Sequence, residues 1–333
     1  MITPPTRRGK PLRHQQKPTG PEQASRRGRP LTKSELNKAS RHHVKRKGRP
    51  KKRNKTENLT SPLTYCPPPM IHPFKDPGAS IEWGERLDTI PGSYPETKSC
   101  VFKVTINSEP FVLKIFKFFN PLTLEYDWSD RLGEDYPLSK AIGYTDPFYA
   151  ECRAYGRIQE ARDKGEITEK IATKCHGYLF LDADAQRWLE NEGIDLGTEN
   201  VDDELLSILG GAGRPRAIVK DFEAAGPDLD KQTPQQIRRI FRRVWLLNKL
   251  GIYNRDVRAD NFRNGWLVDF DSSYTLPHDI YNILPKFEVS VTQGVDVAKF
   301  EEMLEEAGID MKFLAPKRYN LRPRLIKNLS ERN

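Results

Sequence analysis

Three polar side chains late in the chain have the types and spacing that phosphoryl transfer requires. Asn261 follows Asp256 by five residues, and Asp269 opens an Asp-Phe-Asp triplet at the end of an apolar stretch. In that chemistry one Asp orients the attacking hydroxyl, while an Asn and a second Asp hold magnesium on the nucleotide phosphates. The pattern therefore predicts a site in which Asp256 accepts the hydroxyl proton and Asn261 and Asp269 bind Mg²⁺.

A predicted hairpin brings two of these side chains together. Asn264-Gly265 is a strong two-residue turn signal, because both turn positions need positive φ. Phe262-Arg263 before it and Trp266-Leu267-Val268 after it would pair as short strands, so that Asn261 and Asp269 meet at the open end. Two oxygen ligands suit a hard cation that keeps most of its waters. The alternative is a polar loop beside an ordinary β-hairpin.

A lysine and a glutamate upstream extend this set. Lys114 stands inside the apolar segment Phe111–Phe116, which is expected to form a strand. Burying a lysine is costly unless a carboxylate or a phosphate receives it. The helix predicted over Phe148–Arg162 begins at Asp146-Pro147, an N-cap followed by proline, and carries Glu151 as the partner of Lys114. In the alternative, Lys114 faces water from an alternating strand.

Further strands and one long helix are expected to position these residues. The strands are Ser99–Ile106, which forms a hairpin with the lysine strand, Cys175–Leu181 and Arg216–Phe222. Val219 to Phe222 is interpreted as the hinge whose backbone meets the adenine of a nucleotide. Apolar residues with a 3.6-residue period predict a helix from Thr233 to Leu250, which leads directly to Asp256.

Charge is distributed very unevenly along the chain. Residues 1–60 carry 19 Lys and Arg against 3 Asp and Glu, a net charge of +16, whereas the remaining residues have a net charge of −7. Hydrophobic residues make up only 36% of the chain, which contains 26 prolines. A segment so basic and so poor in aliphatic residues cannot bury a core, and we expect it to be disordered on its own.

The basic tail contains the tripeptide Gly-Arg-Pro twice, in the runs Arg26–Pro30 and Arg46–Arg53. Both runs resemble AT-hooks, because a thin Gly and Pro backbone lets the neighbouring arginines lie in the narrow, strongly negative minor groove of A·T-rich DNA. The alternative is a nuclear-import signal or a general polyanion-binding tail. The same tripeptide at Gly213-Arg214-Pro215 lacks a basic run and is expected to be a loop before a strand. The residues expected to contact DNA are Arg27, Gly28, Arg29, Pro30, Lys47, Gly48, Arg49, Pro50, Lys51, Lys52 and Arg53.

Cysteine usage and hydropathy exclude other classes of protein. The four cysteines include no C-x-x-C pair, which predicts a reduced intracellular protein without a disulfide framework or a zinc site. No apolar run approaches the roughly 18 residues needed to span a membrane. Met1–Lys10 lacks the apolar core of a signal peptide.

The order of these residues resembles that of the protein-kinase-like superfamily: Lys114, Glu151, Asp256, Asn261 and Asp269. This resemblance implies a two-lobed α+β fold that binds ATP and Mg²⁺. Asp-Phe-Asp in place of Asp-Phe-Gly is more similar to the small-molecule and lipopolysaccharide kinase branches. The runs ECRAYGRI, RAIVKDF and GIYNRDVRADNFRNGWLVDFDSSYTLPH resemble a fungal inner-kinetochore subunit family called Fta-two, the CENP-P-like member of the Sim-four complex. This likeness covers about residues 78–305. It implies a nuclear, centromere-linked protein with kinetochore subunits as partners.

These expectations divide the chain into four parts. Residues 1–75 form the basic tail with a proline-rich linker, and residues 76–220 form a kinase-like N-lobe with insertions, of which 118–145 has no assigned role. An abbreviated C-lobe follows over residues 221–316, in which the helix around Asp296 resembles the one that braces the catalytic loop. Residues 317–333 are a polar, basic end.

Departures from the kinase pattern leave two classes of function open. No G-x-G-x-x-G precedes the lysine strand, and Gly92 alone is expected to approach the phosphates there. Asn254 replaces the usual histidine of the catalytic loop, and no A-P-E follows Asp269. The first hypothesis is a chromatin adaptor that keeps a kinase-like fold for its shape. The second is an ATP- and Mg²⁺-dependent phosphotransferase acting on a small molecule or protein, in which Lys114 holds the α- and β-phosphates.

Overall fold

The structure, a computed structural model, describes residues 66–88, 98–118, 120–121 and 135–310, all within the part of the chain that runs from Arg53 to Asn333. The two Gly-Arg-Pro runs of the tail, Gly92 and the polar end at 317–333 lie outside the described residues. Among the helices of the described ranges, none is both long and apolar enough to cross a membrane.

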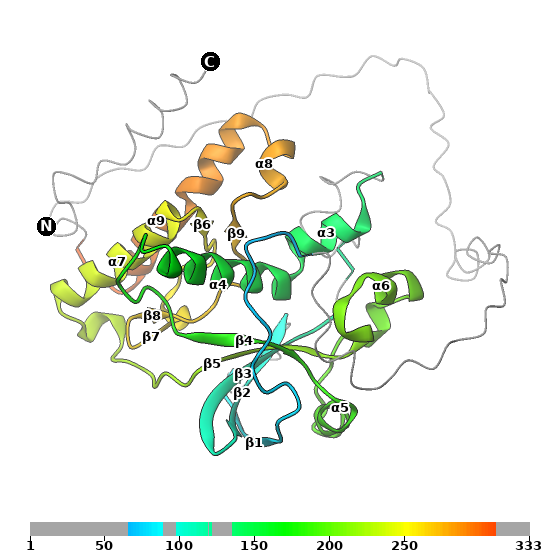
Figure 1. The fold of residues 1–333 in the computed structure, drawn as a ribbon. Helices are drawn as coiled ribbons and strands as arrows, with labels where there is room; N and C mark the ends of the chain where they lie inside the picture. The colour runs from blue at the N-terminus through cyan, green and yellow to red at the C-terminus, as the bar shows by residue number, and fades with distance from the viewer. Residues whose placement is uncertain (1–65, 89–97, 119, 122–134, 311–333) are drawn as a thin grey trace, which may run out of the picture. The chain divides into compact units, whose positions relative to one another are not determined.

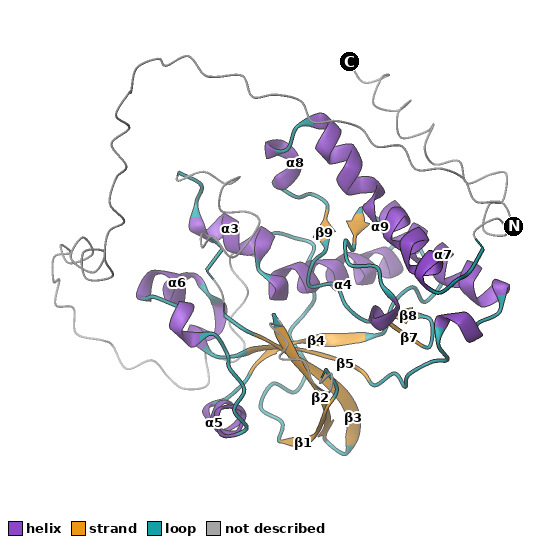
Figure 2. Cartoon of the chain, turned by 180° about the vertical axis from the view of Figure 1, so that it is seen from behind, coloured by secondary structure: helices purple, strands orange, loops and turns teal. Residues whose placement is uncertain are grey.

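A five-stranded antiparallel sheet forms the first half of the described chain (Figures 1 and 2). Its strands, in spatial order, are β1 (Ile81–Arg86), β2 (Ser99–Ile106), β3 (Glu109–Phe116), β5 (Arg216–Asp221) and β4 (Cys175–Phe180). The turn between β2 and β3 is Asn107-Ser108, with φ of 53° and 64°, the positive values that a tight hairpin needs. The four strands expected from the sequence are therefore confirmed to within two residues.

Alternation along β3 sends neighbouring side chains to opposite faces of the sheet. Leu113 and Ile115 pack on the face covered by α5 (Ala183–Asn191), whereas Phe116 packs against α4 (Pro147–Asp163) on the other face. Lys114 shares the α4 face with Phe116 and is only 1% exposed. The alternative of a solvent-facing lysine is therefore excluded.

Helix α4 begins where the sequence predicts. The carboxylate of Asp146 accepts a hydrogen bond of 2.8 Å from the backbone N–H of Phe148, and Pro147 occupies the first helical position. Asp146 also forms a buried ion pair with Arg216 at the start of β5. Because this cap is tied to the sheet, the start of α4 is fixed relative to the strands.

Residues 66–74 lie in the groove between α4 and β4, and we call them the strap. Ile71 N–H donates to the carbonyl of Cys152 on α4 (3.1 Å), and Phe74 N–H donates to the carbonyl of Tyr178 on β4 (2.7 Å). The sequence prediction placed these residues in a proline-rich linker that ends near residue 75. Proline content does favour extended backbone, but the buried side chains of Ile71 and Phe74 make this stretch part of the packed fold.

Mainly helical structure makes up the second half. The remaining α-helices are α3 (Leu138–Thr145), α6 (Asp203–Ile208), α7 (Pro234–Lys249), α8 (Ile280–Ile283) and α9 (Lys286–Glu306). Two short strand pairs join β6 (Ile252–Tyr253) to β9 (Tyr274–Thr275) and β7 (Phe262–Arg263) to β8 (Trp266–Leu267). Single 3₁₀ turns are η1 (Thr198–Asn200), η2 (Gly210–Gly213), η3 (Leu229–Lys231) and η4 (Ala259–Asn261). Helices α7 and α9 lie side by side (Figure 2) around a core of Ile237, Ile240, Val244, Phe300, Met303 and Leu304.

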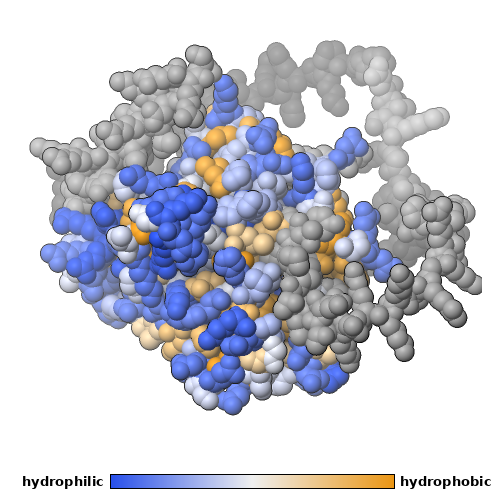
Figure 3. All heavy atoms as spheres, viewed as in Figure 1, coloured by the Kyte–Doolittle hydropathy of each residue, from blue (hydrophilic) through white to orange (hydrophobic). Residues whose placement is uncertain are grey.

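The α+β arrangement confirms the expected fold class, with a sheet lobe followed by a short helical lobe. Apolar side chains gather on the surface over α8 and the start of α9, at the top of Figure 3. Ile283, Phe287 and Val291 are 37%, 69% and 65% exposed. Among the described residues, these three define an apolar patch that is open to solvent.

Candidate functional site

The hairpin of β7 and β8 positions the first two candidate ligands. Its turn residues Asn264 and Gly265 have φ of 50° and 73°, as the sequence predicts for this turn. Beyond the strands, the N–H of Val268 donates to the carbonyl of Asn261 (3.0 Å). Asn261 therefore lies beside the residue that precedes Asp269.

Asn261 also holds the candidate base in place. Its side-chain Nδ2 donates to the backbone carbonyl of Asp256 (2.7 Å) and to the Asp256 carboxylate (2.9 Å). Because the amide nitrogen is used in this way, the amide oxygen is the atom that could ligate a cation. The guanidinium of Arg258 lies 3.5 Å from the Asp256 carboxylate.

Asn254, which replaces the usual histidine, ties the loop to the Asp269 strand. Its Nδ2 donates to the carbonyl of Asp269 (2.6 Å), and its Oδ1 accepts from the N–H of Asp256 (3.1 Å). The buried carboxylate of Asp296 on α9 accepts from the N–H groups of Asn254 (2.7 Å) and Arg255 (2.6 Å). The bracing role expected for this helix is therefore confirmed. Burial raises the pKa of Asp296, while these hydrogen bonds oppose the rise.

Lys114 is surrounded by carboxylates. Its Nζ lies 3.0 Å from Glu151 on α4, 2.6 Å from Asp269 and 3.0 Å from Asp271. Burial alone would lower the pKa of Lys114, but these three carboxylates raise it well above the ordinary value. The structure thus brings Lys114 and Glu151 together as the sequence predicts, and it adds Asp271, which the prediction did not include.

A second buried lysine, Lys220 on β5, was not predicted. Its Nζ donates to Glu151 (2.8 Å) and to the carbonyl of Val268 (2.8 Å), so Glu151 bridges two ammonium groups. The signal that identified Lys114, a lysine inside an apolar strand, is also present in the run RAIVKDF and could have identified Lys220.

These two lysines and three carboxylates form one cluster, which we call the charge cluster. Burial alone would raise the pKa of Asp269, but the ammonium groups of Lys114 and Lys220 lower it to about 2. With all five groups charged, the cluster has a net charge of −1. It therefore favours a further cation at its open side.

The hinge predicted over Val219 to Phe222 overlaps the connection between the lobes only at its last residue. Val219 sits inside β5, where it pairs with Leu113 of β3 on one side and with Gly177 of β4 on the other. It is fully buried, so neither its backbone nor its side chain is available to a nucleotide. The connection between the two lobes begins after Asp221, at the partly exposed Phe222. The role assigned to Val219 is therefore corrected.

The donor chemistry of this site fits a magnesium nucleotide. The amide oxygen of Asn261 and the carboxylates of Asp269 and Asp271 are the hard oxygen ligands that Mg²⁺ accepts together with water and phosphate. Over the described ranges, no group of three or more His, Cys, Asp or Glu residues could hold a metal by itself. When bound, the cation would neutralise the charge of the phosphate groups.

Comparisons with known proteins identify a family for most of the chain. The sequence profile described as "Kinetochore Sim4 complex subunit FTA2" matches residues 59–274, a range that contains the charge cluster, Asp256 and Asn261. A search of curated proteins gave no match.

Two solved structures are similar at low sequence identity. The crystal structure of Rad53 1-466 in complex with AMP-PNP is 14% identical, with a TM-score of 0.25, over 56% of this chain and 37% of that chain. The structure of vaccinia related kinase 3 is 10% identical, with a TM-score of 0.30, over 62% of this chain and 52% of that chain. In both cases the match spans about half or less of the solved chain.

Proposed function

Because the chain belongs to the family of the kinetochore Sim4 complex subunit FTA2, we propose that it is a nuclear subunit of a kinetochore complex that acts as an adaptor. In this proposal the kinase-like body contacts other subunits, and the basic tail places the complex on A·T-rich centromeric chromatin. The match to the family profile is the observation that carries the proposal.

The state of Lys114 supports an adaptor over an enzyme. A lysine that holds nucleotide phosphates must offer its ammonium group to them. Here the Lys114 side chain is 2% exposed and its Nζ contacts Glu151, Asp269 and Asp271. Phosphate could reach this ammonium group only by displacing at least one of the carboxylates. The cluster therefore works as a brace between β3, α4 and the Asp269 loop.

The apolar patch on α8 and α9 supports the same function. Large apolar side chains such as Phe287 and Val291 gain free energy when a partner covers them, and contiguous exposed apolar surface commonly marks an interaction site. A subunit of a multi-protein complex needs such a surface. We assign the patch to contact with another kinetochore subunit.

The DNA part of the proposal is tested by competition between duplexes. Full-length protein is titrated into labelled duplexes of equal length, one A·T-rich and one G·C-rich, at about 150 mM salt. Tighter binding to the A·T-rich duplex is expected, since inserted arginines favour a narrow minor groove. Equal affinity for the two duplexes would show that the tail binds polyanions without a preference for A·T-rich DNA.

A phosphotransferase is the second candidate, and the intact catalytic loop favours it. Asp256 and Asn261 are linked directly, and Asp296 fixes the backbone beneath them. In this function Asp256 accepts the proton of the substrate hydroxyl, and Asn261 and Asp269 bind the magnesium of ATP. A fold kept only for its shape does not require this arrangement.

Thermal unfolding with and without Mg²⁺ and ATP separates the two functions. A ligand that binds the folded state raises the melting temperature. A phosphotransferase should show such a rise in the wild type and lose most of it in Asp269→Asn. Absence of a rise in the wild type would eliminate the second candidate and leave the adaptor proposal unaffected.

A further inference from the structure

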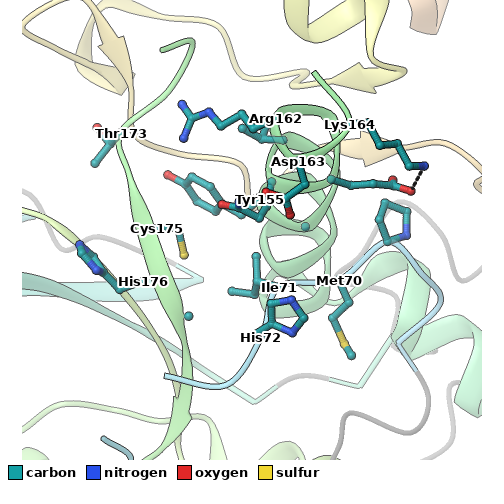
Figure 4. Close-up of a pocket in the computed structure, with 16 residues that line it drawn as sticks. Met70, Ile71, His72, Tyr155, Arg162, Asp163, Lys164, Thr173, Cys175 and His176 are labelled. Atoms are coloured by element: carbon teal, nitrogen blue, oxygen red, sulfur yellow. Dashed lines mark hydrogen bonds and ion pairs between the residues drawn. The ribbon is translucent and has the colours of Figure 1, made fainter. Parts of the chain in front are cut away.

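A cavity of about 470 Å³ lies between α4, the strap and the start of β4 (Figure 4). Its apolar wall includes Met70, Ile71 and Ile158. The ring of Tyr155 extends from α4 toward the segment that carries Thr173 and Cys175. None of the charge-cluster residues lines this cavity, so it is a separate feature of the fold.

Two buried hydroxyl groups line the cavity without a partner. The side chains of Tyr155 and Thr173 are each 3% exposed, and neither hydroxyl has a hydrogen-bond partner among the described residues. Buried polar groups are nearly always hydrogen-bonded, because leaving one unpaired forfeits its hydration. Two such groups among the lining residues, one on α4 and one on the segment before β4, indicate that the cavity receives a polar atom that accepts hydrogen bonds from both.

Four charged side chains around the mouth of the cavity, Glu160, Arg162, Asp163 and Lys164, sum to zero, but not all of them are paired. Glu160 pairs with Lys164 (2.5 Å), and Asp163 accepts a hydrogen bond from Gln159 (2.8 Å). Arg162 has no side-chain partner among the residues that the structure describes, and it lies above Tyr155 and Thr173 in Figure 4. Within the described residues, the Arg162 guanidinium is therefore the cation at the mouth that is not committed to an ion pair.

Helical geometry places Tyr155 and Arg162 on the same face of α4. Tyr155, Gln159 and Arg162 follow an i, i+4, i+7 spacing, which keeps them on one face of α4. A hydroxyl therefore lies deep in the cavity and a guanidinium lies two turns later, near the mouth. A ligand that satisfies both has an anionic oxygen and a short apolar stem that contacts Met70 and Ile158.

We propose that this cavity binds a carboxylate carried on a short aliphatic stem. Hydroxyl and guanidinium donors form strong hydrogen bonds with carboxylate oxygens. A phosphate dianion fits less well, because among the described residues that line the cavity Arg162 supplies the single guanidinium without a side-chain partner, and Asp163 and Glu160 stand at the rim. The carboxylate belongs either to an acidic side chain of a partner polypeptide or to a free small acid.

Ligand-observed NMR on the full-length protein tests this proposal with butyrate, and with butyramide as the neutral isostere. Saturation transfer to butyrate is expected in the wild type. The double variant Tyr155→Phe, Thr173→Val keeps the shape of the cavity and removes both hydroxyls, so butyrate should bind at least about tenfold more weakly. Arg162→Ala should weaken butyrate binding and leave the weak signal of butyramide unchanged.

A matched control removes a tyrosine hydroxyl elsewhere. Tyr136→Phe deletes the donor to Asp279 (2.9 Å) outside the cavity and should bind butyrate like the wild type. Since unpaired hydroxyls do not stabilise the folded state, the double variant should also melt at or above the wild-type temperature. No butyrate signal in the wild type, or equal signals in the wild type and the double variant, would overturn the proposal.

Two blocked tripeptides distinguish the sources of the carboxylate. Acetyl-Ala-Glu-Ala-amide and acetyl-Ala-Gln-Ala-amide differ only in the carboxylate. Binding of butyrate together with the glutamate peptide assigns the cavity to an acidic side chain of a partner. Binding of butyrate alone assigns it to a free acid.

Discussion

A buried charge cluster is stable only while each buried charge keeps an opposite charge beside it. Moving Lys114 and its three carboxylates out of water costs hydration free energy, which their mutual attraction and hydrogen bonds offset. Truncating one member leaves its partners buried without a counter-charge. Removing a buried ion-pair partner is therefore far more costly than removing an exposed one.

Replacing Lys114 with methionine should destabilise the fold by about 3–5 kcal/mol, because Asp269 and Asp271 would lose the ammonium group that contacts them and Glu151 would keep only Lys220. Urea unfolding measures the loss. Lys117→Met is the matched control, since among the described residues the ammonium group of Lys117 pairs with the exposed Asp195 (2.9 Å), and its loss should cost about 1 kcal/mol or less. Equal losses in the two variants would show that the cluster contributes no more than a surface pair.

His278 should make stability sensitive to mild acid. Burial first, and then the nearby charges of Arg153 and Arg255, lower the pKa of His278 well below its usual value of about 6.5. The ring nitrogen Nδ1 accepts from the N–H of Ile280 (3.2 Å), and Nε2 lies 3.0 Å from the carbonyl of Tyr144, an arrangement that requires the neutral ring. The unfolded chain binds a proton near pH 6.5 and the folded chain does not, so stability is lost as pH falls below that value.

Urea unfolding between pH 7.5 and 5.5 checks this expectation. The free energy of unfolding should fall by up to about 1.4 kcal/mol per pH unit below pH 6.5. His278→Asn should be less stable at pH 7.5 and should lack this slope, whereas replacing the exposed His72 with asparagine should keep it. A wild type whose stability is flat over this range would contradict a neutral, buried His278.

Single residues were predictable where a residue type conflicts with its surroundings. A lysine in an apolar strand identified Lys114, and proline after an N-cap aspartate fixed the helix that supplies Glu151. The hinge was predicted to begin at Val219, but that residue lies inside β5. This strand extends further because it pairs with β3 on one side and β4 on the other, and the local sequence does not show where such a strand ends. The involvement of Asp271 depends on the turn from Phe270 to Ser273, in which the N–H of Ser273 donates to the carbonyl of Phe270 (3.0 Å), and spacing alone does not determine this turn.

At the scale of elements, the strap is fixed by close backbone contact with α4. A Cβ atom added at Gly156 would lie 2.4 Å from the backbone of Met70, so the strap can approach the helix only where glycine stands. Helix α4 in turn carries Glu151 and Tyr155 toward the charge cluster and the cavity. The strap therefore holds both features in position.

Gly156→Ala should destabilise the protein by about 1–3 kcal/mol, because the added methyl group overpacks the strap. Gly294→Ala is the control. Gly294 lies within α9 with no atom within 4 Å of the added Cβ, so alanine should stabilise that helix by about 0.5–1 kcal/mol. Thermal unfolding of both variants measures the difference, and a stabilised Gly156→Ala would show that the strap does not pack against α4.

Elements whose formation depends on tertiary packing were not predicted from the sequence. The segment between β4 and β5 is polar and glycine-rich and predicted no structure, yet it forms α5 and α6. Their N-caps, Asp182 and Asp202, are local signals that could have been used. Their stability depends on Leu189 and Leu205, which are fully buried against distant parts of the chain, and no local pattern shows this. The proline-rich strap was misjudged for the same reason.

At the scale of the whole molecule, charge divides the chain into parts with opposite responses to nucleic acid. Residues 1–60 carry +16, and the remaining residues carry −7. An acidic body is repelled by phosphate, so affinity for DNA must come from the tail. Binding through several lysine and arginine contacts releases counterions, and the logarithm of the affinity should therefore fall linearly with the logarithm of the salt concentration.

Sequence preference should depend on the arginines inside the two Gly-Arg-Pro motifs. In the full-length protein, the double variant Arg29→Ala, Arg49→Ala should lose about tenfold or more in affinity for an A·T-rich duplex, because these side chains are the ones expected to enter the minor groove. Affinity for a G·C-rich duplex should fall less, by the loss of two phosphate-attracting charges. Fluorescence anisotropy with both duplexes at about 150 mM salt gives the ratio of the two affinities.

The chain contains its own control for this measurement. Gly213-Arg214-Pro215 repeats the tripeptide within the folded body, where Arg214 joins η2 to β5 outside any basic run. Arg214→Ala should leave the affinity ratio of the two duplexes unchanged, although it removes the same residue from the same tripeptide. If Arg214→Ala lowers the ratio as much as the tail variant does, the preference arises from total charge and not from an extended motif that fits the groove. If only the tail variant lowers it, the basic flanks and the extended setting turn Gly-Arg-Pro into a DNA-binding motif.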